Sequence, residues 1–574
     1  MSEHALDGLA ASRGVAVAPA FVVREAETNG NGAGGEQERA RALQALADVA
    51  RELGDAAEQL RAAGLTNEAE IVEANRLMSE DPSLESEVAA LALHAAAEVA
   101  VVSATERHAT LLAELGDPLL AARAADVREL GRRAARLLAG APPLVLPEFP
   151  VVLVAHELGA AEISELQLAG GAIAGIALAA GSATSHAAIV ARALDLPLVV
   201  ALGEEALVVE DGVTVVLDAD HGRLVVEPSA ATIAEARGAQ RRAVEEKLGL
   251  VALRTRPPVT RDGRRVTLLA NAASAAEVRA GLDAGAEGVG LLRTELAFLE
   301  ARGWPTEAEH FEALVQPLGL LRARVATVRT FDFGEDKTPP FLAGIAERGL
   351  ELALAEPDAL CAQLRAILRA GAETRLRLLF PLVRDAEQLR AARLLLAQSL
   401  ADVGRTLPPP LVGAMIETPE AVANVAAIAA EVDFVSIGTN DLVQYTLGLD
   451  RELPLASTST AASPAVLAHV QAVVTSAHAL GRPVEVCGEA AGEPAVAALL
   501  VGLGVDELSV SPARLDAVRA AVRSLTSTAA SAAAARAAQA ASLDEALALG
   551  RAALSGEAAD ESGELLDSLG GALA

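Results

Sequence analysis

The second half of the chain alternates apolar strand candidates with helical segments eight times. The strand candidates cover 266–270, 288–292, 325–328, 376–380, 411–416, 432–437, 484–486 and 507–510. Eight such units over about 245 residues are typical of a (β/α)₈ barrel of the TIM type. We therefore predict this barrel for 263–525. An Ala-rich and then acidic tail over 526–574 follows, for which we expect one last helix and a frayed end.

Polar and reactive side chains follow the carboxyl ends of these strands, where the active sites of such barrels lie. They are Asn271, Arg293, Arg329, Glu417, Asn440, Asp441 and Cys487. Arginines bind phosphate and carboxylate oxygens with paired hydrogen bonds, and Arg348 and Arg451 lie in nearby loops. Each residue alone is better explained by a surface salt bridge. Their joint placement at the ends of different strands predicts a site for an anionic substrate.

Three of these positions suggest specific chemistry. Glu417 and Asp441 follow neighbouring strands and form an oxygen pair suited to Mg²⁺, which takes its other ligands from water and substrate phosphate. Cys487 ends a strand where arginines and a metal would tune its acidity, which suits proton transfer to or from carbon. The alternative for Cys487 is a small buried apolar side chain, and we expect Cys361 to be structural.

His186 stands where an apolar run over 172–178 gives way to an Ala-rich segment with helical spacing. With Thr184 or Ser185 as the N-cap, its ring lies at the start of a helix. The positive end of the helix dipole disfavours imidazolium and attracts phosphate. A neutral, phosphorylatable histidine fits both effects, and a partly buried histidine on an ordinary capped helix is the alternative.

Strand patterns at 8–23 and 144–227 flank a block with helical spacing and almost no strand signal. We predict an α/β domain that carries His186 and is built from 1–28 and 141–228. The helical subdomain, 29–140, is inserted into it, and a helical linker over 229–262 leads to the barrel. The expected fold class is therefore multidomain α/β.

Charge and composition limit the partners. The net charge of −31 argues against nucleic acid and anionic membranes, which reward clustered Lys and Arg. Two cysteines cannot form a disulfide framework, and no signal peptide precedes the first strand, so we expect a cytoplasmic protein. The uncharged stretch 166–191 contains glycines and a polar cluster, which favours a buried strand, loop and helix over a membrane span.

The helical block is acidic. It carries 14 acidic and five basic side chains between Glu36 and Glu98. A solvated helical surface explains this charge, and a docking surface for a basic partner is the alternative interpretation.

Several longer motifs resemble enzyme I of the phosphoenolpyruvate:sugar phosphotransferase system, over nearly the whole chain. They are Thr184-Ser185-His186, Gly288-Val289-Gly290-Leu291-Leu292-Arg293-Thr294-Glu295, Val328-Arg329-Thr330-Phe331-Asp332-Phe333-Gly334, Glu417-Thr418-Pro419, Ser436-Ile437-Gly438-Thr439-Asn440-Asp441-Leu442 with Gln444-Tyr445-Thr446, Asp450-Arg451, and Cys487-Gly488-Glu489. Long matches in the same order are highly specific.

This resemblance implies a phosphoenolpyruvate-protein phosphotransferase, and it implies a role for each matching residue. His186 would be phosphorylated by phosphoenolpyruvate, and Cys487 would donate the proton that turns enolpyruvate into pyruvate. The residues that would hold the substrate are Arg293, Arg329, Asn440, Asp441 and Arg451, with Arg348 and Lys337, and Mg²⁺ would bind to Glu417 and Asp441. The helical subdomain would bind the carrier protein HPr, which takes the phosphoryl group from His186, and the barrel would form a homodimer. The His186 domain would swing between barrel and carrier.

Some positions depart from the family pattern. Gly181-Ser182-Ala183 stands where the family has Gly-Gly-Arg, Glu335 replaces a glycine, Glu351 replaces an arginine, and the segment from Lys337 to Arg348 is shortened. These departures leave open a non-catalytic paralogue that acts as a dimeric interaction protein. A relative of pyruvate phosphate dikinase or phosphoenolpyruvate synthase is a further alternative, but such proteins need a nucleotide-binding domain, and the sequence contains no P-loop signature.

Overall fold

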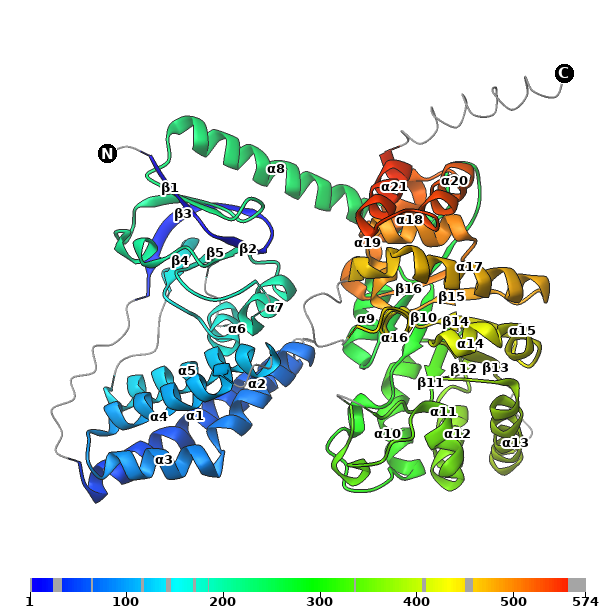
Figure 1. Ribbon diagram of the computed structural model, residues 1–574, viewed down its shortest axis with the longest axis horizontal. Helices are drawn as coiled ribbons and strands as arrows, with labels where there is room; N and C mark the ends of the chain where they lie inside the picture. The colour runs from blue at the N-terminus through cyan, green and yellow to red at the C-terminus, as the bar shows by residue number, and fades with distance from the viewer. Residues whose placement is uncertain are drawn as a thin grey trace. The chain divides into compact units, whose positions relative to one another are not determined.

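The computed structural model describes residues 3–23, 34–62, 66–114, 118–140, 146–168, 172–183, 185–334, 337–404, 409–449 and 458–555. The chain divides into two compact units, Met1–Lys247 and Leu248–Ala574 (Figure 1). Each unit has its own buried apolar core. None of the helices in the described part of the chain has the length and apolar character that a membrane crossing demands.

The N-terminal unit contains an eight-stranded sheet in the order β1-β8-β7-β3-β4-β5-β6-β2. Its strands are β1 (His4–Asp7), β2 (Leu9–Ser12), β3 (Val15–Val22), β4 (Val151–Ala155), β5 (Ile173–Leu178), β6 (Leu198–Val200), β7 (Thr214–Asp218) and β8 (Arg223–Val226). Strands β3 to β6 run parallel, whereas β7, β8, β1 and β2 pair in antiparallel fashion. Every residue of β4 is buried, as its unbroken apolar sequence requires of a strand covered on both faces.

Two short helices of the sheet domain, α6 (Ala160–Leu168) and α7 (His186–Ala193), pack against each other. They share a buried apolar cluster with strands β4, β5 and β6. The uncharged stretch 166–191 is therefore the end of α6, strand β5 and the start of α7, and not a membrane span. This arrangement places the first residue of α7 just beyond the carboxyl end of β5.

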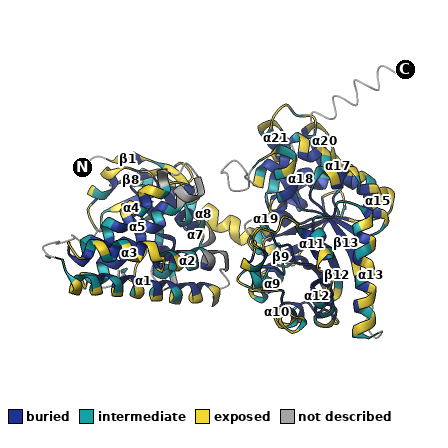
Figure 2. Ribbon diagram, turned by 60° about the horizontal axis from the view of Figure 1, so that its bottom comes forward, coloured by how far each residue is buried: buried dark blue, intermediate teal, exposed yellow. Residues whose placement is uncertain are grey.

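Five helices lie between the neighbouring strands β3 and β4 in the sequence. They are α1 (Glu36–Ala62), α2 (Thr66–Ser79), α3 (Pro82–Ala92), α4 (Ala97–Glu114) and α5 (Pro118–Leu138). Their apolar faces form one core, which Figure 2 shows as dark blue turned inward with yellow on the outer surfaces. At their inner end, α1 and α2 contact α6, and α2 also contacts α7.

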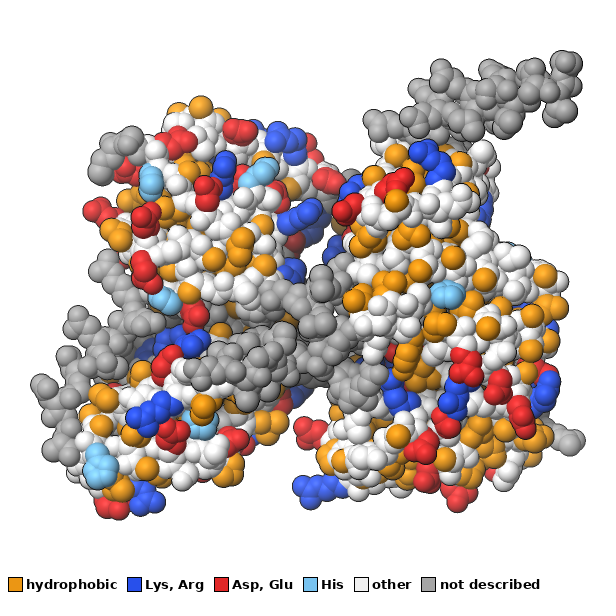
Figure 3. All heavy atoms as spheres, viewed as in Figure 1, with side chains coloured by type: hydrophobic (Ala, Val, Ile, Leu, Met, Phe, Trp, Pro, Cys, Tyr) orange, Lys and Arg blue, Asp and Glu red, His pale blue; other side chains and the backbone are white. Residues whose placement is uncertain are grey.

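The surface of this helical block carries mixed charge. All five arginines between Glu36 and Glu98 form ion pairs with acidic side chains of the block, such as Arg41 with Glu98 and Arg76 with Glu80. Figure 3 shows acidic and basic side chains interspersed on the visible face. Acidic side chains nevertheless outnumber basic ones, so the surface keeps a net negative charge.

The C-terminal unit is built on a closed barrel in the order β10-β11-β12-β13-β14-β15-β16-β9, with all neighbours parallel. Its strands are β9 (Thr267–Ala272), β10 (Gly288–Leu292), β11 (Val325–Arg329), β12 (Arg375–Phe380), β13 (Leu411–Ile416), β14 (Phe434–Ile437), β15 (Val484–Val486) and β16 (Glu507–Val510). The prediction of a multidomain α/β fold with a (β/α)₈ barrel is confirmed.

Helices surround the barrel, and α8 (Ala230–Ala252) precedes it. The surrounding helices are α9 (Ala275–Asp283), α10 (Glu307–Gly319), α11 (Gly349–Ala355), α12 (Pro357–Ala370), α13 (Ala386–Val403), α14 (Pro419–Ala423), α15 (Val425–Ala430), α16 (Thr439–Leu447), α17 (Pro464–Ala479), α18 (Pro494–Leu503) and α19 (Leu515–Ser524). Their inward faces and the outward faces of the strands form the largest apolar core of the protein. Cys361 lies buried on α12 within this layer, as expected of a structural cysteine.

The Ala-rich segment after Ser524 contains two packed helices, where the sequence suggests one last helix and a frayed tail. Helices α20 (Ser527–Ala537) and α21 (Leu543–Ser555) both contact α18. The helices lie close because, at each contact, a glycine of one helix meets the backbone of the other. A Cβ added at Gly502 on α18 would lie 2.1 Å from the Ala530 main-chain oxygen on α20. A Cβ added at Gly550 on α21 would lie 2.5 Å from the Ala495 main-chain oxygen on α18. Alanine and glycine permit this close approach, so the composition that suggested a tail builds helix packing instead.

Candidate functional site

His186 is the first residue of α7. The Ser185 side chain caps this helix by accepting a hydrogen bond of 3.3 Å from the Ala188 N–H, which confirms one of the two predicted caps. Thr184, the other, lies outside the described residues. The ring is held at a helix start, where unpaired N–H groups favour bound phosphate. Its side chain is 15% exposed, so the ring is largely shielded and still accessible at its edge.

A carboxylate from the helical block fixes the orientation of this ring. Asp126 on α5 is 5% exposed, and its Oδ2 lies 2.7 Å from His186 Nδ1. The contact occupies Nδ1 and leaves Nε2 as the ring nitrogen that Asp126 does not contact.

Helix α5 is anchored to the sheet domain by further ion pairs. Arg133, with 1% of its side chain exposed, donates to both carboxyl oxygens of Glu165 on α6 at 2.8 and 3.0 Å. Arg136 pairs with Glu162 on the same helix at 3.1 Å. Buried pairs of this kind fix the register between two elements because losing either partner leaves an unpaired charge. They hold Asp126 in place beside α7.

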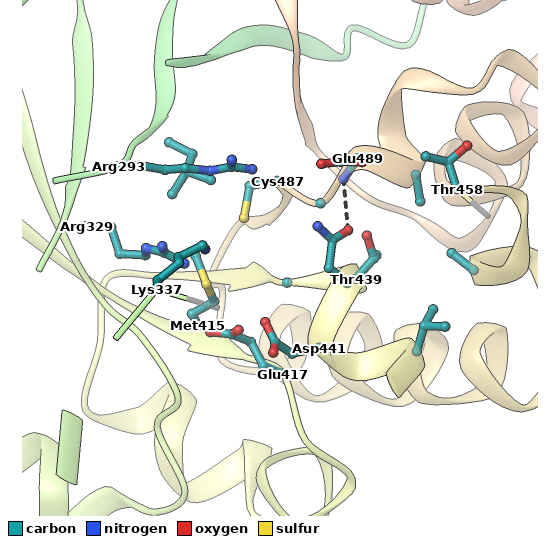
Figure 4. A pocket seen from close by; sticks show the side chains of 17 residues that line it. Arg293, Arg329, Lys337, Met415, Glu417, Thr439, Asp441, Thr458, Cys487 and Glu489 are labelled. Atoms are coloured by element: carbon teal, nitrogen blue, oxygen red, sulfur yellow. Dashed lines mark hydrogen bonds between the residues drawn. The ribbon is translucent and has the colours of Figure 1, made fainter. Parts of the chain in front are cut away.

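The barrel has a cavity of about 320 Å³ at the carboxyl ends of its strands. Among its lining residues are seven that the sequence analysis names for this site: Arg293, Arg329, Lys337, Glu417, Asn440, Asp441 and Cys487. Figure 4 shows Arg293, Arg329 and Lys337 extending from one side, with Glu417 and Asp441 on another and Cys487 between them. The structure thus brings together cations, a pair of carboxylates and a thiol around one cavity.

Arg329 is a buried cation held between carboxylates. Its guanidinium forms ion pairs with Glu295 and, at 2.9 Å, with Asp332. Burial opposes the charge of Arg329, but Asp332 and Glu295 together raise its pKa well above the ordinary value. The same burial raises the pKa of Asp332, whereas Arg329 and Lys337 overcome burial at Glu295 and lower its pKa. The Lys337 Nζ lies 3.7 Å from the same Glu295 oxygen, so this cluster holds two cations at the cavity wall.

Glu417 and Asp441 are buried side by side, with 1% and 6% of their surfaces exposed. The Leu382 N–H donates to Glu417 Oε1 at 3.1 Å, and the two carboxyl groups are hydrogen-bonded to each other. Burial, and then the charge of Asp441, raise the pKa of Glu417 well above its usual range. Among the described residues no cluster of three or more His, Cys, Asp or Glu side chains could hold a metal ion. A divalent cation here would therefore depend on two carboxylates, with water and substrate supplying other ligands.

Cys487 is both buried and part of the cavity lining. It is 2% exposed, and its Sγ accepts a hydrogen bond of 3.2 Å from the Ser436 hydroxyl. Burial, and then the nearby Glu485, raise the pKa of the thiol to about 12. The sulfur therefore keeps its proton throughout the neutral pH range.

Other expected site residues lie elsewhere. Arg348 does not line the cavity, and its guanidinium donates to the Tyr445 hydroxyl at 3.2 Å. Glu351 forms an ion pair of 2.5 Å with Arg384 and is also absent from the cavity wall, so its charge is balanced locally. Arg451 lies outside the described residues, as do Glu335 and residues 450–457.

Several residues at these sites were not predicted. Thr439, Thr458 and Glu489 line the cavity, and the Glu489 N–H donates to Asn440 Oδ1 at 3.2 Å. These residues follow barrel strands or lie in loops near the predicted residues. Their position in the sequence, close to the predicted residues, could therefore have identified them. Asp126 has no such signal, because a single Asp on a charged helix is normally solvated and its partner lies 60 residues away.

Three family models match successive parts of the chain. They are described as "PEP-utilising enzyme, N-terminal" for residues 7–123, "PEP-utilising enzyme, mobile domain" for 147–222 and "PEP-utilising enzyme, PEP-binding domain" for 247–527. The first range includes only part of the helix that carries Asp126. The second range includes His186, and the third includes the barrel cavity. The order of the three models follows the order of the structural parts along the chain.

Curated relatives match over most of the sequence. A phosphoenolpyruvate-protein phosphotransferase of Cupriavidus necator is 35% identical over 89% of this chain and 92% of its own, and one of Haemophilus influenzae is 34% identical over 80% and 82%. A multiphosphoryl transfer protein of Xanthomonas campestris is 38% identical over 91% of this chain, which spans 64% of that relative's length. The chain belongs to the phosphoenolpyruvate-protein phosphotransferase family of PEP-utilising enzymes.

Proposed function

We propose that the chain transfers the phosphoryl group of phosphoenolpyruvate to His186 and then to a histidine of HPr, with release of pyruvate. The observation that carries this proposal is the cavity that gathers Arg293, Arg329, Lys337, Glu417, Asp441 and Cys487. Phosphoryl transfer needs positive charge around the transferring group, and protonation of enolpyruvate needs a nearby acid. The residues around this one cavity supply both the positive charge and the acid.

The cations have different tasks. Arg329 is already held by Glu295 and Asp332, so it presents a fixed, partly compensated charge. Arg293 forms no ion pair with any other residue that the structure describes, so its guanidinium would be the main group for binding the substrate's phosphate or carboxylate. Asn440 and Lys337 at the wall would complete the substrate contacts, and Arg451 is proposed as a further contact on the family resemblance alone.

Glu417 and Asp441 would hold Mg²⁺. Two buried carboxylates in contact fit a divalent cation, because each raises the energy of ionising the other. When bound, the ion would neutralise negative charge on the phosphoryl group. The family resemblance alone supports Arg348 as a member of this site. In the structure its guanidinium donates a hydrogen bond to the Tyr445 hydroxyl instead of lining the cavity.

At the other reaction centre, His186 Nε2 would attack phosphorus while the bond from phosphorus to the enol oxygen breaks. Asp126 would stabilise the positive charge that develops on the ring and keep Nε2 directed outward. Cys487 would then give its proton to C3 of enolpyruvate and form pyruvate. A thiol that stays protonated at neutral pH is suited to this step.

The helical block is the proposed docking surface for HPr, and the net negative charge between Glu36 and Glu98 would favour a basic carrier. By the same family resemblance, the barrel would form a homodimer and the protein would act in the cytoplasm.

The test uses purified protein, radiolabelled phosphoenolpyruvate and Mg²⁺, with and without HPr. We expect an acid-labile, alkali-stable label on the wild type that passes to HPr, and no label on His186→Ala. Chelation of the metal should stop labelling. A folded wild-type protein that takes no label would contradict the proposal and favour the non-catalytic paralogue, motivated by Ser182, Ala183 and Glu351.

A further inference from the structure

Glu485 is a buried carboxyl group inside the barrel that the proposed chemistry does not use. It lies on β15 with 1% of its surface exposed. Neither carboxyl oxygen has a hydrogen-bond partner among the residues that the structure describes. An unpartnered carboxylate in such a place is costly, so the group is held neutral: burial, and then Glu507, raise its pKa well above the usual range. The protonated form of the Glu485 carboxyl group is therefore favoured inside the barrel.

The carboxyl group occupies space that a distant glycine leaves free. A Cβ at Gly290 on β10 would lie 2.1 Å from Glu485 Oε1. In the closed barrel, β15 and β10 are separated by β16 and β9. The Glu485 side chain therefore extends through the barrel interior to the far wall, and only glycine at position 290 makes room for it.

Glu485 and Cys487 face the same interior. Glu485 lies on β15 and Cys487 directly follows the last residue of that strand. Continued strand geometry over these residues places the two side chains on the same side, with α-carbons roughly 6.6 Å apart. A negative charge on Glu485 would raise the pKa of Cys487, so the protonation states of the two groups are linked.

Polar side chains also lie in this part of the barrel interior. Asn271 Nδ2 donates to the Cys487 main-chain oxygen at 2.9 Å, and the Ser509 hydroxyl donates to Asn271 Oδ1 at 2.6 Å. The Ser509 Oγ lies 2.5 Å from the same Cβ position at Gly290 that Glu485 approaches.

Charged groups face Glu485 from several strands. Glu507 on β16 and Arg377 on β12 form an ion pair of 2.5 Å below it, and Arg329 and Glu417 act on Cys487 above it. Arg377 also lines a second cavity of about 320 Å³ at the amino ends of β11, β12 and β13.

We propose that Glu485 returns a proton to Cys487 after Cys487 has protonated enolpyruvate. This inference rests on the proposed function. In the first step the S–H bond of Cys487 breaks, a C–H bond forms at C3, and the electron pair stays on sulfur. In the second step the O–H bond of Glu485 breaks and its proton passes to the thiolate, directly or through one water. The carboxylate then regains a proton from solvent.

The direction of transfer follows from the environment of the sulfur. Burial raises the pKa of Cys487 to about 12, so a thiolate formed there is a strong base that takes a proton from an adjacent acid. Glu485 acts through Cys487 and touches no substrate, so it is a positioning residue for the proton and not a catalytic residue. Its loss should affect proton exchange with solvent and leave phosphoryl transfer intact.

The test compares two rates in full-length wild type and Glu485→Gln, with phosphoenolpyruvate, pyruvate and Mg²⁺ in D₂O. Exchange of radiocarbon between pyruvate and phosphoenolpyruvate reports phosphoryl transfer and carbon protonation, and needs no proton from solvent. Deuterium entering the pyruvate methyl group, followed by proton NMR, reports exchange of the Cys487 proton with solvent. For Glu485→Gln we expect wild-type radiocarbon exchange and deuterium entry slowed by about a hundredfold, the lower end of what a positioned acid contributes.

Thr327→Val is the matched control, because Thr327 is fully buried on β11 in the same interior and its hydroxyl has no partner within the described chain. It should keep both rates. An equal fall of both rates in Glu485→Gln would assign Glu485 a purely structural role and overturn the proposal. Unchanged deuterium entry would also overturn it, because the thiolate would then be reprotonated through the cavity mouth. A wild type without radiocarbon exchange would overturn the proposed function itself, and the relay with it.

Discussion

At the scale of single residues, the contact between Asp126 and His186 bears on the proposed phosphorylation. Asp126 Oδ2 lies 2.7 Å from His186 Nδ1, so under the proposed function Nε2 would be the nucleophile. Ser185 fixes the helix start from which the ring projects. The chemistry proposed for His186 therefore depends on a residue in a different part of the N-terminal unit as well as on the helix that carries the ring.

Replacing Asp126 by Asn should slow phosphorylation of His186. A hydrogen bond to a charged group is worth about 1.5–3 kcal/mol, which corresponds to a rate lower by about 10- to 100-fold. The measurement is the single-turnover rate of label transfer from phosphoenolpyruvate. Glu157→Gln is the control, because Glu157 lines the small cavity beside His186 and pairs with Arg132 instead of the ring. Equal rates in wild type and Asp126→Asn would show that the contact does not orient the nucleophile.

At the scale of helices and strands, much of the architecture could be predicted from sequence. The barrel strands are short apolar runs because parallel strands are buried on both faces, and that pattern is readable without long-range information. The residues after the strands could be predicted for the same reason, since the fold sends every strand end to one mouth.

Other features depend on contacts between distant segments and were not predictable. Asp126, Glu485 and Gly290 look like ordinary residues of a helix and two strands until the fold brings their partners to them. The Ala-rich segment from 527 to 555 was interpreted as a tail because composition alone does not show that α18 offers glycine and alanine for close packing.

The packing of α20 on α18 can be tested at Gly502. A Cβ there would lie 2.1 Å from the Ala530 oxygen, so Gly502→Ala should force the helices apart and destabilise the C-terminal unit by about 1–3 kcal/mol. Chemical denaturation followed by circular dichroism gives the free energy of unfolding. Gly319→Ala on α10 is the control, since no atom lies within 4 Å of its added Cβ and its stability should hold or rise. Equal stability of the two variants would refute the close packing of α20.

At the scale of the whole molecule, the two proposed reaction centres belong to separate compact units. His186 and Asp126 lie within Met1–Lys247, whereas every residue of the barrel cavity lies within Leu248–Ala574. Under the proposed function, the N-terminal unit would hold the phosphoryl group, and the C-terminal unit would release it from phosphoenolpyruvate.

A protein of residues 1–247 alone should accept a phosphoryl group from phosphorylated HPr and take none from phosphoenolpyruvate. The first reaction needs only the ring, its carboxylate and the docking helices, while the second needs Arg293, Glu417 and Asp441. Gel analysis with each labelled donor measures both reactions. Labelling of this shorter protein by phosphoenolpyruvate would mean that the barrel cavity is not the site of substrate binding.

Phosphorus NMR of the full-length protein mixed with phosphoenolpyruvate and Mg²⁺ tests the central claim most directly, because it identifies both the residue and the nitrogen that carry the phosphoryl group. The account predicts one phosphohistidine signal of the Nε2 type, absent from His186→Ala. A folded wild type with no phosphohistidine signal, or with phosphorus on Nδ1, would contradict it.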